Sequence, residues 1–140
     1  MKKFVFELEQ LLNLRKYEQD QAQVELGKAV QVEQQIQDGL DTLAQQYVAT
    51  KKLTSGQTDF AAIAKTQQFY QFIKQQQEKL MNDMAKAKLV TEEKRALFNA
   101  AMQKHESLKK LKEKQYELFK AQVKKEEAKA LDDIVTAKYN

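Results

Sequence analysis

The stretch Thr54-Ser55-Gly56-Gln57-Thr58-Asp59 decides the fold, because it is the only cluster of turn-forming and helix-capping residues in the chain. Two lysines precede it, and positive charge is favourable at the C-terminus of a helix. Gly56 can adopt the left-handed conformation that ends a helix, and the threonine or aspartate that follows can cap the next one. The sequence therefore predicts helix one over about 4–53, a turn at about 54–58 and helix two over about 59–136.

The composition on both sides of this break favours helices. The 140 residues include no Pro, no Cys, no Trp and only three Gly. Proline in a helix interior costs roughly 3 kcal/mol, so its absence permits helix throughout. The bulk of Ala, Leu, Lys, Glu and Gln is typical of long helices and coiled coils. The mean hydropathy of −0.73 is too polar for a thick globular core. A thin seam between two helices is what such a chain can bury.

The apolar residues follow the heptad spacing of a coiled coil on both sides of the break. Steps of four and three residues from Leu8 reach twelve positions on the first helix, nine of them apolar: Leu8, Leu12, Arg15, Gln19, Ala22, Leu26, Ala29, Glu33, Ile36, Leu40, Leu43 and Tyr47. The same steps on the second helix reach fifteen positions, ten of them apolar: Phe69, Ile73, Gln76, Leu80, Asp83, Ala87, Val90, Lys94, Leu97, Ala101, Lys104, Leu108, Leu111, Gln115 and Leu118. Past Leu118 the apolar residues shift track to Phe119, Val123, Ala130 and Ile134, which predicts local unwinding there.

A short break between two long helices makes them antiparallel neighbours. We therefore predict an all-α fold, a long antiparallel two-helix coiled-coil hairpin with unequal helices, in one domain over 1–140. Helix one would pair with residues near 59–109, and the last ~25–30 residues would project without an intramolecular partner. A lone helix of that length is marginal in water. The projecting end is therefore expected to bind another protein.

The sequence offers no set of residues for catalysis, a metal or a cofactor. His105 is the only histidine, and there is no cysteine to share a metal with it. Adjacent carboxylates such as Glu92 and Glu93 point about 100° apart on a helix, so they do not form an acid/base pair. No two glycines have the six-residue spacing of a phosphate-binding loop. A two-helix hairpin also lacks a concave pocket. We predict a non-enzymatic protein without cofactors.

Charge and hydropathy also disfavour nucleic acid and membrane partners. The net charge is +4, and residues 86–129 hold thirteen basic and seven acidic side chains. This excess fits an acidic partner surface, although a solvated face of mixed sign remains an equal alternative. The glutamates dilute any phosphate-binding field. No apolar run approaches the ~20 residues that a bilayer crossing needs. The start MKKFVFELEQ lacks the apolar region of a secretory signal, because Glu7 and Glu9 interrupt it.

One cluster of aromatic residues, Phe69-Tyr70-Gln71-Phe72-Ile73, exceeds what a single seam can bury. Neighbouring residues on a helix diverge by about 100°, so the three aromatic side chains cannot all face one partner helix. At least one is expected to be exposed, and exposed aromatics are frequent hot spots of protein–protein interfaces. The alternative, that they only wrap the narrow seam, remains open.

Three segments carry patterns of a known family. The first helix begins with the pattern F-x-L-x-x-L-L-x-L-R, carried by Phe6, Leu8, Leu11, Leu12, Leu14 and Arg15. The segment FYQFIKQQQEKL (69–80) follows the turn, and the run EEAKALDDIVTAKY (126–139) ends the chain with Glu127, Leu131, Asp132, Asp133 and Ile134. These segments resemble the start, the region after the turn and the C-terminal ending of the FliJ family, the small coiled-coil components of the flagellar type III export apparatus.

The resemblance implies a fold similar to the γ stalk of rotary ATPases. It implies a cytoplasmic protein of flagellum biogenesis and motility, held at the inner membrane through the export apparatus. Its partners would be the hexameric export ATPase, the cytoplasmic domain of the export-gate membrane protein and the export chaperones. Its roles would be those of central stalk, ATPase regulator, gate adaptor and general export chaperone. Two alternatives remain: the equivalent stalk of a virulence type III injectisome, and a generic coiled-coil scaffold.

The resemblance also implies two sets of partner-binding residues. The gate-binding set is Leu40, Leu43, Tyr47 and Phe72. Leu43 stands where the family often has an aromatic residue, and Leu40 and Tyr47 also fall on the predicted seam, so a core role remains open for them. The residues expected to meet the ATPase ring are the apolar positions near the end of helix two: Leu118, Phe119, Val123, Leu131 and Ile134.

Overall fold

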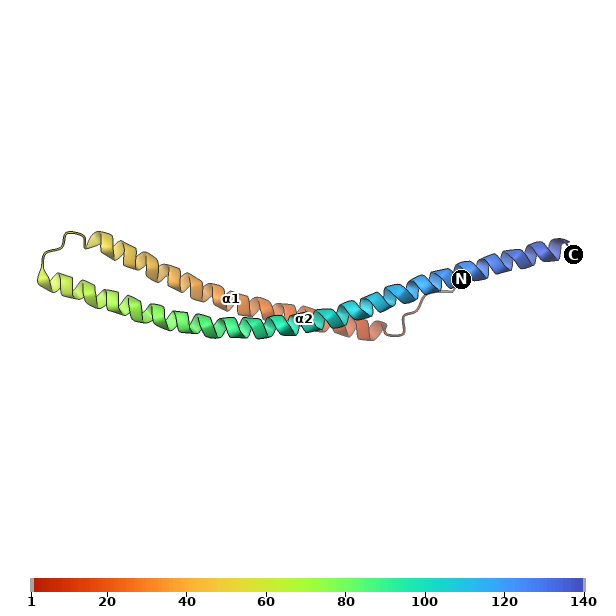
Figure 1. Ribbon diagram of the computed structural model, residues 1–140, viewed down its shortest axis with the longest axis horizontal. Coiled ribbons are helices and arrows are strands. Elements are labelled where there is room, and N and C mark those ends of the chain that lie inside the picture. The colour runs from red at the N-terminus through yellow and green to blue at the C-terminus, as the bar shows by residue number, and fades with distance from the viewer. Residues whose placement is uncertain (1, 140) are drawn as a thin grey trace. The chain divides into compact units, whose positions relative to one another are not determined.

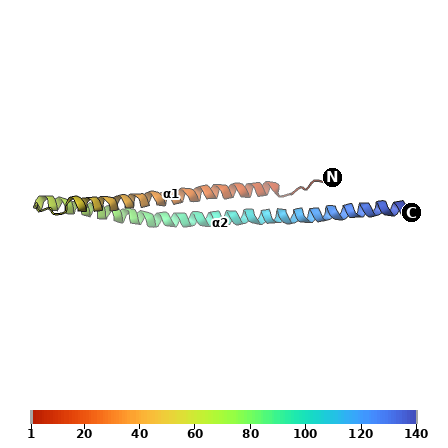
Figure 2. The ribbon, with the colours of Figure 1, turned by 90° about the horizontal axis from the view of Figure 1, so that it is seen from above.

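The computed structural model describes residues 2–139, which form two α-helices and no strand. Helix α1 (Glu9–Leu53) has 45 residues and α2 (Phe60–Tyr139) has 80. The chain divides into two compact units: the turn unit, Ala22–Phe98, and the terminal unit, whose described residues are 2–21 and 99–139. In each unit part of α1 lies beside part of α2 and runs in the opposite direction (Figure 1 and Figure 2). The predicted all-α, antiparallel, two-helix hairpin with unequal helices is confirmed.

The turn between the helices supplies hydrogen-bond partners for backbone groups that have no partner within the end of α1. The amide and the hydroxyl of Thr54 both donate to the Thr50 carbonyl, at 3.0 and 2.7 Å. The Gln57 amide donates to the Thr54 carbonyl at 3.2 Å. Gly56 has φ 80°, the left-handed conformation that the sequence predicts for it. Ile63 then donates to the carbonyl of Asp59, which lies directly before α2.

A narrow seam joins the two helices within the turn unit. Its buried side chains are Ala29, Leu43, Ile73, Ala87 and Thr91. Gly39 allows a close approach of the helices, because a Cβ at this position would lie 3.1 Å from Cδ1 of Leu80.

The seam predicted for the first helix is confirmed along its length. Of its twelve positions only the two at the ends, Leu8 and Tyr47, are exposed. Arg15, Gln19 and Glu33 are half-buried, so these polar residues occupy the seam as the heptad spacing predicts.

The seam predicted for the second helix is only partly right beyond Ala87. Lys94, Ala101 and Leu108 are half-buried as predicted, but Val90, Leu97, Leu111 and Leu118 are exposed. Between Ala87 and Lys112 the buried or half-buried positions are Thr91, Lys94, Phe98, Ala101, Met102, His105, Leu108 and Lys112. Two successive four-residue steps, from Asp83 to Ala87 to Thr91, shift the track here rather than past Leu118.

Polar contacts between the two helices explain this shift of the seam. A count of apolar residues along one helix cannot detect such contacts. Thr91 is 4% exposed, and its hydroxyl contacts the Glu33 carboxylate of α1 as well as the Ala87 carbonyl. In the terminal unit the Lys112 ammonium donates to Glu9 of α1 at 3.0 Å, so its aliphatic stem can lie along the seam. Both side chains are therefore satisfied at positions where the heptad count favours leucine or valine.

The N-terminal residues form an extended arm and not the first turns of a helix. The sequence predicts helix from about residue 4, but α1 begins at Glu9. Along 2–8, called the arm below, Phe4 is half-buried, Val5 is exposed and Phe6 is 5% exposed, an alternation typical of extended chain. Phe6 packs into the terminal unit, and its carbonyl accepts a hydrogen bond from the Glu9 amide at 3.1 Å.

The arm extends the cover of α2 well beyond the start of α1. Glu9 pairs with Lys112 and Lys2 pairs with Glu126, at 3.6 Å. The seven residues of the arm comprise extended chain over 2–6 and a turn at Glu7 and Leu8. The fourteen residues between Lys112 and Glu126 span about 21 Å of helix. A helical start of seven residues would lie beside about seven residues of α2, whereas the arm lies beside about fourteen.

The free end of α2 is consequently shorter than the sequence predicts. Instead of ~25–30 residues, the uniformly exposed segment is Lys124–Tyr139, called the tail below. It remains helical to Tyr139. Over the described residues, neither helix contains an apolar stretch long enough to cross a membrane.

Candidate partner-binding surfaces

The four residues expected to bind the export gate differ in the solvent exposure of their side chains. All belong to the turn unit. Leu43 is buried in the seam and Leu40 is half-buried. Tyr47 and Phe72 are 40% and 51% exposed. Only the two aromatic residues therefore present substantial side-chain surface, and the position of Leu43 favours a core role.

Aromatic rings from both helices meet beside the turn. The Tyr47 ring of α1 lies 4.9 Å from the Tyr70 ring of α2, with 50° between their planes. A shallow groove of about 550 Å³ lies next to this pair and is lined by Tyr47, Val48, Lys51, Lys52 and Ser55. The end of the turn unit thus combines aromatic surface with two lysines.

The five residues expected to meet the ATPase ring belong to the terminal unit and fall into two groups. Leu118, Leu131 and Ile134 are each more than 60% exposed. Phe119 and Val123 are half-buried, because the arm lies beside them. Phe4 of the arm contacts two rings of α2, Tyr116 at 5.2 Å and Phe119 at 5.6 Å between centroids.

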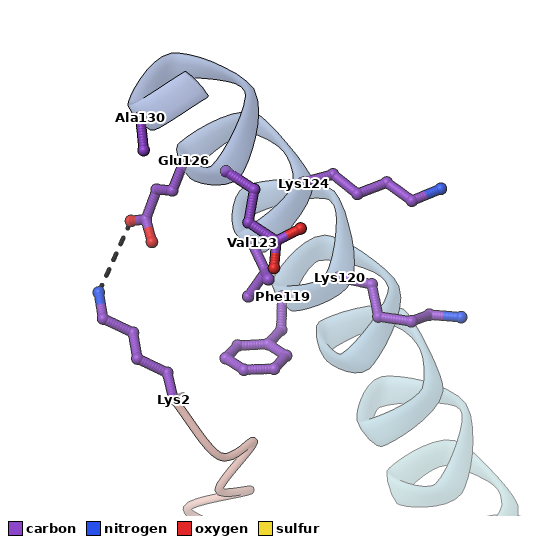
Figure 3. A pocket seen from close by; sticks show the side chains of 8 residues that line it. Lys2, Phe119, Lys120, Val123, Lys124, Glu126 and Ala130 are labelled. Carbon is purple, nitrogen blue, oxygen red and sulfur yellow. Dashed lines mark ion pairs between the residues drawn. The ribbon is translucent and has the colours of Figure 1, made fainter. Parts of the chain in front are cut away.

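A groove of about 500 Å³ lies between the arm and α2 (Figure 3). Phe119 and Val123 project into it, and Ala130 lies at its far end. Lys2 forms one wall and reaches Glu126 across the groove. Lys120 and Lys124 extend from the opposite side of α2, away from Lys2 (Figure 3). The remaining lining residue is Glu127.

Lys120, at the rim of this groove, contacts a carboxylate and an aromatic ring of α2. The Glu117 carboxylate lies 3.0 Å from Lys120 Nζ and raises the pKa of Lys120, through their hydrogen bond and their charge attraction. The Lys120 ammonium also lies 4.9 Å from the centre of the Tyr116 ring, a cation–π contact. These contacts hold Lys120 beside the groove.

The described residues hold no group of three or more His, Cys, Asp or Glu side chains arranged for a metal ion. His105 lies in the seam of the terminal unit, and its Nδ1 is buried without a hydrogen-bond partner. Both grooves described above are open to solvent on one side. These surfaces are suited to contact with another protein.

The arm is the part of the candidate site that the sequence interpretation missed. Phe4 and Phe6 were assigned to the helical start, where aromatic residues two apart point to different faces. The signal that could have identified them is their alternation with Lys3, Val5 and Glu7, which fits the two-residue period of extended chain.

The fold and these surfaces define a class: a two-helix coiled-coil protein that presents aromatic and apolar side chains to protein partners. Comparison with known families identifies the member of this class. The family described as Flagellar FliJ protein matches residues 4–140, nearly the whole chain, and the chain belongs to this family. It is therefore a coiled-coil protein associated with flagellar protein export, in a family of non-enzymatic structural and chaperone-type proteins. No curated protein and no solved structure matches the chain.

Proposed function

We propose that this protein is the central stalk and regulator of the hexameric flagellar export ATPase, and that it also serves as adaptor to the export gate and as general export chaperone. Membership of the family supports the export setting. The observation that carries the stalk role is the exposed helical tail, Lys124–Tyr139, whose apolar residues have no partner within the described chain.

The tail needs a partner for physical reasons. A helix of sixteen residues that buries none of its side chains is marginal in water. The tail nevertheless exposes Leu131, Ile134 and Val135, so folding within this chain does not stabilise it. Insertion into the pore of a hexameric ring would bury this surface, as the γ stalk does in rotary ATPases. The arm and the start of α1 lie in the same unit as the tail, so the ring would meet the terminal unit.

The gate-binding role uses the aromatic surface of the turn unit. Tyr47 and Phe72 are exposed, and aromatic side chains are the commonest anchors of protein–protein interfaces. Leu43 contributes indirectly, by packing the seam that holds α1 against α2. Through the ring, the gate and the export chaperones the protein would be held at the cytoplasmic face of the inner membrane.

Stimulation of the cognate export ATPase tests the stalk role. The full chain should raise the ATPase rate of the purified hexameric enzyme, and a chain truncated after Glu127 should not. The truncation removes exposed residues and retains the arm contacts and the seam, so its helical circular dichroism per residue should be unchanged. Phe72→Ala, which alters only the turn unit, is the matched control and should stimulate like the full chain. Equal stimulation by the truncated and full chains would refute the stalk role.

Binding to the purified cytoplasmic domain of the export gate tests the adaptor role. Phe72→Ala should weaken binding by roughly 30-fold, the loss of a typical hot-spot residue, with no change in helical content. Leu43→Ala is the control for a seam residue, and it should lower thermal stability. If Phe72→Ala leaves gate binding intact, or lowers helicity as Leu43→Ala does, the aromatic surface is not the gate-binding site.

A further inference from the structure

The groove between the arm and α2 continues an interface that the chain already uses. One stripe of α2 packs against α1 as far as Lys112, and then against the arm through Tyr116 and Phe119. The groove opens where this cover ends, and the stripe continues into the tail. An interface of helix against helix is thus already established on this face of α2; it ends where α1 begins at Glu9, and the arm continues the cover as far as Lys2.

The floor of the groove has the geometry of a helix-packing stripe. At about 100° per residue, four side chains of α2 fall within about 60° of one another: Phe119, Val123, Ala130 and Ile134. Their spacing of four, seven and four residues is the heptad spacing of the seam itself. Ala130 lies at the far end of the groove, where its small side chain leaves room for a larger side chain from a partner, and Ile134 continues the stripe beyond the groove. This spacing suits a helix better than an extended peptide.

One edge of the stripe is rich in lysine. Lys120, Lys124 and Lys138 lie on this edge, with Glu127 as the acidic residue among them. The other edge is of mixed charge, since it carries Glu126, Asp133 and Lys129, and Lys2 of the arm stands beside it. Figure 3 shows the first part of this arrangement, with Lys120 and Lys124 on the side of α2 away from Glu126. A partner that packs on the stripe therefore meets the more strongly basic edge at Lys120 and Lys124.

We propose that this groove binds an amphipathic helix of the partner. The helix presents an apolar stripe to Phe119, Val123 and Ala130, and carboxylates to the edge that carries Lys120 and Lys124. The arm is part of the site, because Phe4 supports the Phe119 ring and Lys2 forms the opposite wall. This proposal rests on the proposed function in one respect: the proposed function identifies the export ATPase as the protein that supplies the helix.

Paired charge reversals test the lysine edge. Lys120→Glu with Lys124→Glu should weaken binding of the purified cognate export ATPase by about tenfold or more, at about 0.15 M ionic strength. Lys110→Glu with Lys114→Glu is the matched control, with the same charge change and the same four-residue spacing. Its lysines lie about 160° from the stripe, so binding should change less than about twofold. An equal loss from both pairs would reflect only the overall charge and would overturn the proposal.

An arm variant tests whether the arm belongs to the site. Phe4→Ala removes the ring that contacts Tyr116 and Phe119, and it should weaken ATPase binding together with the lysine pair. Tighter binding by Phe4→Ala would mean that the arm covers the surface and does not form its wall, and unchanged binding would remove the arm from the site. Either result overturns this part of the proposal.

Photo-cross-linking separates this proposal from the proposed function. With a photoreactive benzoylphenylalanine in place of Val123, the cross-linked peptide from cell extract supplemented with the ATPase is identified by mass spectrometry. An ATPase peptide with an apolar heptad stripe edged by carboxylates supports both proposals. The same type of helix from another protein supports the groove but not the stalk role. An ATPase loop without this pattern, or a second copy of this chain, overturns the groove proposal.

Discussion

Two glycines within α1 provide a matched test of the packing described here. Gly27 and Gly39 both lie in the helix interior, where Gly is less favourable than Ala by about 1 kcal/mol. Nothing lies within 4 Å of a Cβ placed at Gly27. Gly27→Ala should therefore raise the free energy of unfolding by about 1 kcal/mol, close to the full difference in helix propensity.

Gly39→Ala should gain much less. Its Cβ would lie 3.1 Å from Cδ1 of Leu80, closer than ordinary van der Waals contact. To relieve this contact the Leu80 side chain has to move by a few tenths of an ångström, and displacing a χ angle from its staggered minimum costs about 0.5–1.5 kcal/mol. This cost offsets the gain in helix propensity, so the net change should be near zero. The two alanine variants should thus differ by about 1 kcal/mol, with Gly27→Ala the more stable.

Urea unfolding followed by circular dichroism at 222 nm measures the difference, provided that the slope with urea is the same in all variants. A double-mutant cycle adds Leu80→Ala, which removes the crowding atom. In that background Gly39→Ala should regain most of its propensity gain. Equal stabilisation by the two glycine replacements in the wild-type background would refute the close approach of α1 and α2 at Gly39.

Three further variants test individual contacts. Thr91→Val keeps the shape of the side chain but removes the hydroxyl that contacts Glu33. Urea unfolding should show a loss of about 1–3 kcal/mol in the free energy of unfolding, and an unchanged stability would contradict a structural role for this contact. His105→Leu replaces a seam residue whose Nδ1 is buried without a partner, and a raised melting temperature is expected, whereas a lowered one would mean that His105 has a partner in solution. Phe6→Ala should release the arm and speed amide hydrogen exchange over 4–12 while leaving exchange in the turn unit unchanged; slow exchange at the arm in this variant would show that Phe6 does not hold it.

The sequence predicted the features that depend on local patterns. The turn between the helices could be located from Gly56 and its neighbours, since few other residues in the chain could form a turn. The heptad count placed the α1 seam, because nearly all its apolar residues lie on one track. Both inferences rest on interactions between residues close in sequence, or on a period that one helix displays by itself.

Features that depend on a partner element were not predictable in this way. Thr91 enters the α2 seam because Glu33 lies opposite, and Lys112 enters because Glu9 does. A count of apolar residues along α2 instead assigns Val90 and Leu111 to the seam, in the same turns of the helix. The arm was missed for a related reason, since Phe4 gains its contacts only from Tyr116 and Phe119. The surfaces that remain exposed on α2 therefore follow from long-range polar contacts, and only the pairing of the two helices reveals them.

The exchange of polar for apolar residues in this seam has a consequence for function. In the terminal unit His105 and Lys112 are half-buried while Leu111 and Leu118 are exposed, although a rotation of α2 by about 100° would bury the leucines. Burying a leucine contributes about 1.5–3 kcal/mol, so the observed rotation gives up part of the stability available to the hairpin. In the observed rotation the Lys112 ammonium reaches Glu9, and Phe119 faces the arm and the groove. A seam rebuilt on Leu111 and Leu118 would rotate α2 by about 100°, and it would turn Phe119 and the groove away from the position that the arm now supports.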